Sequence, residues 1–225
     1  GGSDYLEIAL LMVGGSFVTA ASNGANQIWE RDIDKLMSRT QNRPLPLGIM
    51  SLRFAYAIVI VLLIIGSVLL FLINLKCMLL GFSAFISYVF IYTPMKSKSA
   101  WAVFIGAFPG AIPPFLGAIA ATNAFGFLPG VLFFIQFTWQ FPHFWAIAWV
   151  SHDDYQKAGY QLLPSSLGRS KQSAFQILIY SIALIPFSLI PWLLDWTGNT
   201  TFVIAALLGT LFFIYAYKLF LSQED

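Results

Sequence analysis

The chain has 225 residues, of which 58% are apolar and only 10% are charged, and its mean hydropathy is +0.76. These values exclude an ordinary soluble domain, in which roughly 25% of the residues are charged. Twelve Lys and Arg against ten Asp and Glu leave a net charge of +2, too balanced for bulk electrostatic binding of nucleic acid. The single cysteine, Cys77, excludes an internal disulfide. We therefore expect an integral membrane protein that binds no nucleic acid.

Seven apolar stretches are long enough to cross a lipid bilayer as helices. Such a helix takes about 20 residues, because every backbone polar group must be satisfied within the segment. The stretches are Tyr5 to Ala21, Phe54 to Ile73, Met78 to Thr93, Trp101 to Ala121, Phe127 to Val150, Phe175 to Leu194 and Thr200 to Leu221. No repeat or long polar linker divides them. The sequence therefore predicts an all-α, polytopic membrane helical bundle that forms a single domain over residues 1–225.

The basic residues predict the orientation of this bundle. If the stretches alternate in direction, eleven of the twelve Lys and Arg fall on one side, and only Lys76 falls on the other. Cytoplasmic loops of membrane proteins are enriched in Lys and Arg, so this side is predicted to be cytoplasmic, or to face the matrix of a mitochondrion. It receives segment 23–53, the loops at 94–99 and 151–172, and the C-terminal end.

A polar segment continues the first apolar stretch without a proline, so we expect the first helix to extend past the membrane. Asn26, Glu30 and Asp34 are four residues apart and share one helix face over about 12 Å. Oxygen ligands select hard cations such as Mg²⁺, whose coordination is often completed by phosphate and water. This acidic stripe (Asn26, Glu30 and Asp34) therefore predicts a site for Mg²⁺ and a diphosphate. The alternative is a solvated face whose acids pair with basic neighbours on the same helix.

A second acidic cluster, Asp153 and Asp154, follows the fifth apolar stretch. The predicted orientation places this cluster on the same side as the acidic stripe, so carboxylates from two helices are expected to converge there on metal. The cations expected to bind the diphosphate are Arg39, Arg43, Lys96, Lys98 and Lys157. The alternative for each cation is that it serves only as an orientation signal.

Two apolar stretches carry features that are unfavourable inside a bilayer. The stretch from Trp101 to Ala121 contains three prolines and three glycines, so we expect a kinked or broken helix that walls a cavity, packs closely through glycine, or does both. The stretch from Phe127 to Val150 contains Gln140 and His143 among aromatic residues. The imidazole is either a heme ligand or a hydrogen-bonding partner of a neighbouring helix.

Taken together, the motifs resemble those of the heme O synthases (protoheme IX farnesyltransferases), which belong to the UbiA superfamily of intramembrane prenyltransferases. The segments that carry the resemblance are Asn26–Asp34 with Arg39–Pro44, Tyr92–Lys96, Pro109–Pro114, Trp139–His143 and Asp154–Gly159. They occur in the order of the family and cover nearly the whole chain. In the superfamily's first motif, often Asn-Asp-x-x-Asp-x-x-x-Asp, this chain has Gln27 and Glu30 at two positions.

The resemblance implies a fold of about nine helices, of which this chain would lack the first and last. It implies Mg²⁺-dependent transfer of a farnesyl group from farnesyl diphosphate to a vinyl group of heme B. The product would be heme O, on the route to heme A for cytochrome oxidase assembly, which makes heme A synthase a further expected partner. The expected location is a bacterial cytoplasmic (inner) membrane, and the mitochondrial inner membrane is the alternative.

The resemblance also implies roles for individual residues. The expected catalytic residues are Asn26, Glu30, Asp34, Asp154 and Tyr92, and the metal ligands are Asn26, Glu30, Asp34 and Asp154, with Asp153 as a further candidate. Tyr92 would face the developing allylic cation or donate a hydrogen bond. His143 and Gln140 would contact the heme.

Two other functions stay open at this point. An enzyme with the same metal chemistry could prenylate an aromatic quinone precursor, and such an enzyme would show no spectral response to heme. A non-catalytic transporter of heme or lipid would also use broken helices and buried polar residues. A transporter, however, gives no reason for two acidic clusters and several arginines on one face.

Overall fold

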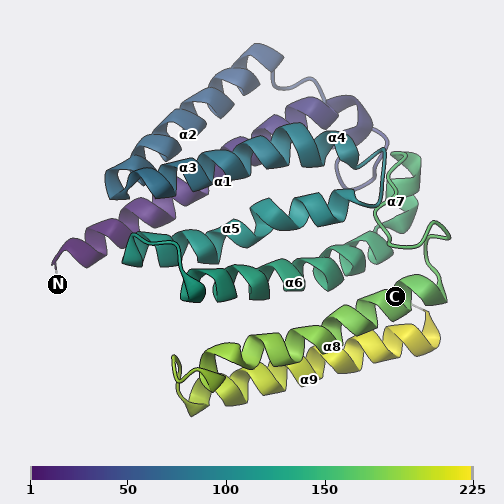
Figure 1. Ribbon diagram of the computed structural model, residues 1–225. Helices are drawn as coiled ribbons and strands as arrows, with labels where there is room; N and C mark the ends of the chain where they lie inside the picture. Colours follow the sequence, from purple (N-terminus) through teal and green to yellow (C-terminus); the bar gives the residue numbers. More distant parts are fainter. Residues whose placement is uncertain (1, 224–225) are drawn as a thin grey trace.

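The computed structural model describes residues 2–223, and this part of the chain is helical apart from its connecting loops (Figure 1). The elements are α1 (Gly2–Asp34), α2 (Leu52–Ile73), α3 (Leu75–Ile86), the π-helical turn η1 (Ser87–Tyr92), α4 (Thr93–Met95), α5 (Ala102–Thr122), α6 (Phe127–Val150), α7 (His152–Lys157), α8 (Lys171–Leu193) and α9 (Asn199–Ser222). The predicted all-α bundle is confirmed. The extension of the first helix past its apolar part, to Asp34, is also confirmed.

Within residues 2–223, six segments are long and apolar enough to cross a membrane. They are Tyr5–Asp34, Leu52–Ile73, Leu75–Met95, Ala102–Thr122, Lys171–Leu193 and Asn199–Ser222. The seventh predicted span is present as α6, whose 24 residues give it the necessary length. Gln136, Gln140 and His143 lower its hydropathy, so α6 does not meet the composition that the other six share.

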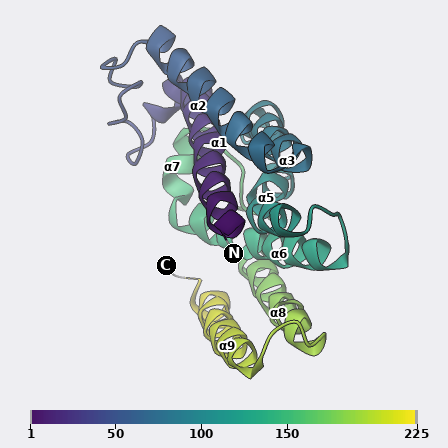
Figure 2. The ribbon, with the colours of Figure 1, turned by 90° about the vertical axis from the view of Figure 1, so that its left-hand side faces the viewer.

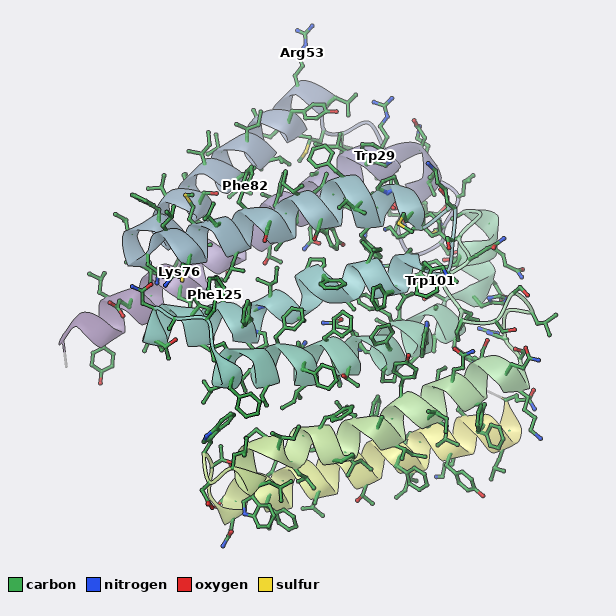
Figure 3. The ribbon with its side chains drawn as sticks, in the orientation of Figure 1. Trp29, Arg53, Lys76, Phe82, Trp101 and Phe125 are labelled. Carbon is green, nitrogen blue, oxygen red and sulfur yellow. The ribbon has the colours of Figure 1, made fainter. Side chains whose placement is uncertain are left out.

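The helices pack in a curved row that follows their order in the chain for the most part (Figure 2). Helix α1 packs on α2 and α3, α3 packs on α5, α5 on α6, α6 on α8, and α8 on α9. Segment 35–51, the α4–α5 loop and α7 gather at the same end of the helices, on the right in Figure 1. Lys76 and Phe125 lie together at the opposite end, away from Trp101 (Figure 3). This arrangement agrees with the alternation on which the predicted orientation rests.

Helix α5, expected to be kinked or broken, is continuous from Ala102 to Thr122 despite its prolines, so it is not broken. Pro114 has no N–H to donate to the carbonyl of Gly110, four residues earlier. Gln140 of α6 supplies this hydrogen bond, with its Nε2 atom 2.9 Å from the Gly110 oxygen. A Cβ atom on Gly110 would lie 2.5 Å from Nε2, so the contact needs glycine. The predicted close packing through glycine is confirmed here.

The π-helical turn η1 joins α3 to α4 and presents Tyr92 to the interior. The N–H of Thr93 donates to the carbonyl of Tyr88, five residues earlier, and Pro94 follows without an N–H of its own. The ring of Tyr92 lies against Gly106 of α5, where a Cβ atom would come within 2.7 Å of the ring. Single π turns inside helices occur often at functional sites.

Candidate functional site

A cavity of about 490 Å³ opens at the end of the molecule where the predicted cytoplasmic loops gather. We call it the polar cavity. Its polar and aromatic lining comprises Asn23, Asn26, Gln27, Glu30 and Asp34 from α1, Arg39 and Arg43 from the following segment, and Tyr88, Tyr92, Lys96, Phe144, Ser151, Tyr155 and Tyr160. The cavity thus collects side chains from at least four separate parts of the sequence.

The acidic stripe of α1 forms one wall of the polar cavity. Asn26, Glu30 and Asp34 are 8%, 4% and 0% exposed. Arg31 of α1 and Lys35, just after the helix, pair instead with Asp32 on its exposed face. Acidic residues are almost never buried to this degree without a partner from elsewhere. The interpretation of the stripe as a solvated face is therefore wrong.

Two ion pairs join the stripe to bases from other segments. Lys96 Nζ lies 2.6 Å from Glu30 Oε1 and 2.8 Å from Oε2. Arg43 Nη1 lies 2.8 Å from Asp34 Oδ2. Burial lowers the pKa of Lys96, and the carboxylate of Glu30 opposes this shift. Each pair therefore combines one predicted metal ligand with one predicted diphosphate ligand.

Segment 35–51 reaches the cavity because it folds back on the end of α1. The hydroxyl of Thr40 is buried and donates to the carbonyl of Asp34 at 2.9 Å. This bond satisfies one of the last carbonyls of the helix, which have no partner within it. The turn that it stabilises brings Arg43 over the carboxylate of Asp34.

Two tyrosine rings flank the ammonium group of Lys96. Its Nζ atom lies 5.2 Å from the centroid of the Tyr92 ring and 5.4 Å from that of Tyr160. Both distances are in the range of cation–π attraction. Burial raises the pKa of Tyr160, and the carboxylate of Glu30 adds to this shift, so the phenol stays protonated in the cavity wall.

The residues of the polar cavity fit a hard metal ion. Asp34 Oδ1 is buried and has no hydrogen-bond partner among the described residues. With Glu30 and Asn26 on the same wall, it forms a set of oxygen donors of the type that Mg²⁺ prefers. No group of three or more His, Cys, Asp or Glu side chains within residues 2–223 is close enough to hold an ion alone. Phosphate and water would have to complete the coordination.

The second acidic cluster lies beside the polar cavity and does not line it. Asp154 accepts hydrogen bonds from Ser38 Oγ at 3.0 Å and from the backbone N–H of Arg39 at 3.3 Å. Lys157 Nζ lies 3.0 Å from the same carboxylate, and these contacts, with that of Lys157 the largest, lower the pKa of Asp154 to about 2. Asp153 is exposed. The clusters share one end of the molecule, but their carboxylates do not line one cavity.

The predicted diphosphate ligands divide in the same way. Arg39, Arg43 and Lys96 line the polar cavity. Lys98 and Lys157 are exposed and lie outside its lining. Sequence reasoning missed Tyr155 and Tyr160, which do line it. Both lie within or directly after the Asp154–Gly159 motif, and that position was the available signal.

Neither predicted heme contact lines the polar cavity. The amide nitrogen of Gln140 donates to Gly110. His143 is half-buried and stacks on Trp139 of its own helix, with ring centroids 4.2 Å apart and an interplanar angle of 16°. Trp139 also lines a separate apolar groove of about 710 Å³ formed by α6, α8 and α9.

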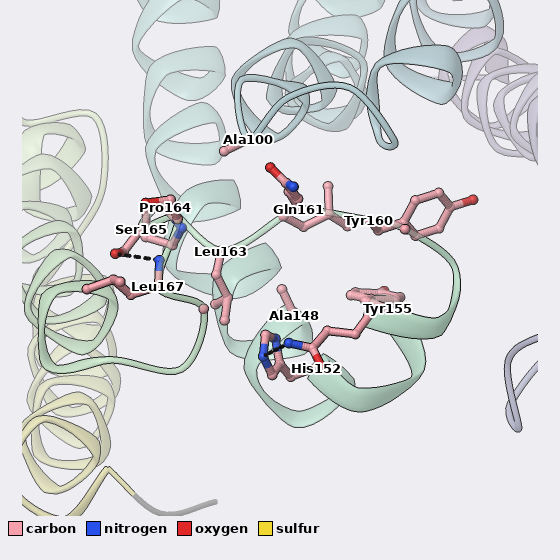
Figure 4. A pocket seen from close by; sticks show the side chains of 15 residues that line it. Ala100, Ala148, His152, Tyr155, Tyr160, Gln161, Leu163, Pro164, Ser165 and Leu167 are labelled. Atoms are coloured by element: carbon pink, nitrogen blue, oxygen red, sulfur yellow. Dashed lines mark hydrogen bonds between the residues drawn. The ribbon is translucent and has the colours of Figure 1, made fainter.

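A third cavity, of about 660 Å³, lies between α7 and the loop that follows it (Figure 4). The imidazole of His152 lines it, lies 3.0 Å from Gln156 Nε2, and packs on Gly168, whose φ is +69°. Figure 4 shows the ring of Tyr160 pointing away from this cavity. None of its described lining residues is Asp, Glu, Lys or Arg, so it is not a candidate for binding a diphosphate.

Comparison with known proteins identifies the family of this chain: the sequence model of the UbiA prenyltransferase family matches residues 1–225. The chain belongs to this family. It is therefore a prenyltransferase, as the motifs predict. Relatives in the family include the protoheme IX farnesyltransferase of Cytophaga hutchinsonii, 48% identical over 219 residues that cover 96% of this chain and 77% of the relative. The enzyme of the same name from Solibacter usitatus is 42% identical, over 95% of this chain and 73% of the relative.

Solved structures of UbiA proteins share the fold. A UbiA homolog from Aeropyrum pernix K1 matches 97% of this chain and 82% of its own, with a TM-score of 0.81 and 22% identity. A UbiA homolog from Archaeoglobus fulgidus bound to DMAPP and Mg²⁺ matches 95% of this chain and 75% of its own, with a TM-score of 0.75 and 22% identity. The predicted UbiA-like architecture is thereby confirmed.

Proposed function

We propose that this prenyltransferase transfers a farnesyl group from farnesyl diphosphate to a vinyl group of heme B and produces heme O. The observation that carries the proposal is the polar cavity, in which two buried acids each pair with a base at the predicted cytoplasmic end. The names of the relatives support heme as the acceptor. The Archaeoglobus fulgidus homolog, bound to DMAPP and Mg²⁺, supports a prenyl diphosphate with Mg²⁺ as the donor.

In this proposal, the two ion pairs are those of the substrate-free cavity. When the diphosphate binds, Lys96 and Arg43 exchange a carboxylate partner for phosphate oxygens, which they contact by charge-assisted hydrogen bonds. Glu30 and Asp34 are then free, with Asn26, to hold Mg²⁺. The bound ion would supply positive charge that stabilises the leaving diphosphate. Diphosphate and metal should therefore each favour the binding of the other.

Transfer breaks the bond between the first farnesyl carbon and its phosphate oxygen. A vinyl carbon of heme B forms the new carbon–carbon bond, and water adds to the resulting cation and releases a proton. The ring face of Tyr92, in the cavity wall, is placed to stabilise the allylic cation. Phe144, Ile147 and Val103 line the same cavity and limit the access of water to that cation before the heme reacts.

The heme acceptor belongs, in this proposal, next to α6. His143 and Trp139 form a stacked pair, and Trp139 faces the apolar groove of about 710 Å³. An apolar groove whose tryptophan stacks on an imidazole suits a porphyrin, whose iron binds imidazole nitrogen. Because the named relatives are bacterial proteins, we place the enzyme in a bacterial cytoplasmic membrane. Heme A synthase would consume the product.

The test uses the full chain in lipid nanodiscs with heme B, farnesyl diphosphate and Mg²⁺, and detects heme O by mass. We expect product with Mg²⁺ and none after removal of divalent ions by EDTA. Absence of heme O under both reducing and oxidising conditions, with folded protein, would contradict the proposal. Product from 4-hydroxybenzoate together with an unchanged heme spectrum would favour the quinone-precursor alternative. His143→Ala should weaken the heme-induced absorbance change without weakening the binding of farnesyl diphosphate.

A further inference from the structure

Thr93 is the first residue of α4, directly after η1, is 3% exposed, and does not line the polar cavity. Its hydroxyl nevertheless joins two parts of the site. Oγ1 donates to the carbonyl of Tyr88 at 2.8 Å, and it accepts a hydrogen bond from Asn26 Nδ2 at 3.2 Å. Thr93 is thus bonded to a residue that the acidic stripe contributes to the cavity wall.

The hydroxyl of Thr93 has one proton, and the carbonyl of Tyr88 takes it. The oxygen can therefore only accept from its other neighbour. An asparagine side chain has a donor end and an acceptor end, and the hydrogen-bond network decides which end faces which neighbour. The amide nitrogen of Asn26 must face Thr93, and the other end of the amide, Oδ1, is left for the cavity.

The local backbone explains why the proton of Thr93 is committed. The π turn directs the carbonyl of Tyr88 at Thr93, which donates to it with both its N–H and its hydroxyl. Pro94 cannot contribute an N–H to the carbonyls of this turn. The Thr93-Pro94 pair thus fixes the direction of the hydroxyl before any ligand arrives.

We propose that Thr93 is a positioning residue that orients the Asn26 amide so that its oxygen, not its nitrogen, is presented to the metal ion that accompanies the prenyl diphosphate. The proposal rests on the proposed function, since it assumes that the polar cavity binds a metal ion and a diphosphate. Partners of this kind, which orient a metal ligand without touching the metal, typically change metal affinity 10- to 100-fold when they are replaced.

The competing explanation is that the bond between Asn26 and Thr93 merely ties α1 to α4. Thr93→Val keeps the shape of the side chain but removes the acceptor for Asn26, so the amide loses its preferred orientation. Thr93→Ser keeps the hydroxyl and should keep the function. Thr210→Val is the matched control, because the hydroxyl of Thr210 bonds only within α9, to the Ala206 carbonyl at 2.7 Å.

The experiment measures binding rather than turnover. Farnesyl thiodiphosphate, an unreactive analogue, is titrated into the full chain in nanodiscs at increasing Mg²⁺ and without heme, by isothermal titration calorimetry. We expect Thr93→Val to raise the Mg²⁺ concentration for half-maximal binding about 10-fold or more. Thr93→Ser and Thr210→Val should change it less than about 3-fold. If valine prevents folding, Thr93→Cys replaces it, because a thiol is a weak hydrogen-bonding group.

A double-mutant cycle separates positioning from structure. In an Asn26→Ala background, Thr93→Val should cause no further loss of Mg²⁺ affinity, because the amide through which Thr93 acts is gone. A full additional loss in that background, or an unchanged Mg²⁺ requirement in Thr93→Val alone, would overturn the inference and leave the proposed function standing. Analogue binding by the unmodified chain that ignores Mg²⁺ would instead overturn the metal assignment itself, and this inference with it.

Discussion

The acidic residues of α1 and those around α7 lie at the same end of the molecule but in different environments. Asp34 is fully buried, pairs with Arg43 through one oxygen, and keeps its other oxygen without a partner among the described residues. Asp154 is half-buried and shares its carboxylate among Ser38, Arg39 and Lys157. One carboxylate retains a free ligand position in a cavity, whereas the other connects α7 to segment 35–51.

The difference follows from the helix to which each acid belongs. Helix α1 continues unbroken to Asp34, so its acidic residues keep the face that the rest of the helix directs into the bundle. Helix α7 is a separate six-residue helix after Ser151, and its orientation is set by the loops that it contacts. Acids on the unbroken helix α1 therefore line the cavity, whereas an acid on the short helix α7 only links that helix to a neighbouring segment.

The largest expected effect is the loss of an acid from the α1 wall. Glu30→Gln or Asp34→Asn should reduce heme O formation about 10³-fold, as expected when a group that organises transition-state charge is removed. Turnover is measured by mass, and folding by thermal denaturation. Because the changes leave the buried Lys96 or the half-buried Arg43 without its acidic partner, Asp34→Asn with Arg43→Gln serves as the control that removes both charges of one pair. Near-normal turnover in both single variants would refute the assignment.

The next effect separates two lysines that are close in sequence. Lys96→Gln should lower kcat/KM for farnesyl diphosphate about 10- to 100-fold, because it removes a charge-assisted hydrogen bond to phosphate. Lys98→Gln, at an exposed position outside the cavity, should change it less than about 2-fold. The comparison is made by steady-state kinetics at saturating heme. Equal losses in both variants would indicate a general electrostatic effect of this face.

A smaller effect is expected at Asp154. Asp154→Asn should raise KM for farnesyl diphosphate on the order of 10-fold, since it weakens the bonds that hold the segment bearing Arg39. Ser38→Ala removes one of those bonds and should act in the same direction, but less. If Asp154 instead ligates the metal during turnover, its replacement will match the loss seen for Asp34→Asn and exceed that of Ser38→Ala.

The smallest effect is expected at Asp153, the exposed neighbour of Asp154. Asp153→Asn should leave kcat, KM and the Mg²⁺ requirement within about 2-fold of the unmodified enzyme. The same titrations measure it. A strong rise in the Mg²⁺ requirement would show that α7 turns toward the cavity when the substrate binds.

Many features of the architecture can be predicted from short stretches of sequence. Apolar length predicts the spans, the side-specific excess of Lys and Arg predicts their direction, and a spacing of four predicts that Asn26, Glu30 and Asp34 share a face. Each of these properties depends on residues within one helix or on the number of Lys and Arg in the loops on each side. Whether prolines break a helix is not local information in the same sense: α5 is continuous, and Gln140 of another helix supplies the hydrogen bond that Pro114 cannot make.

The partners of these residues, in contrast, follow from the packing of the helices. Nothing in the spacing of Glu30 and Asp34 indicates that Lys96 and Arg43, rather than the basic residues of α1, neutralise them. The hydrogen bond between Asn26 and Thr93 joins residues 67 positions apart, and the direction of Asp154 depends on a loop from the other half of the chain. A helix repeats its geometry every few residues, so its faces can be read from sequence. Contacts between distant segments depend on how all the helices pack at once.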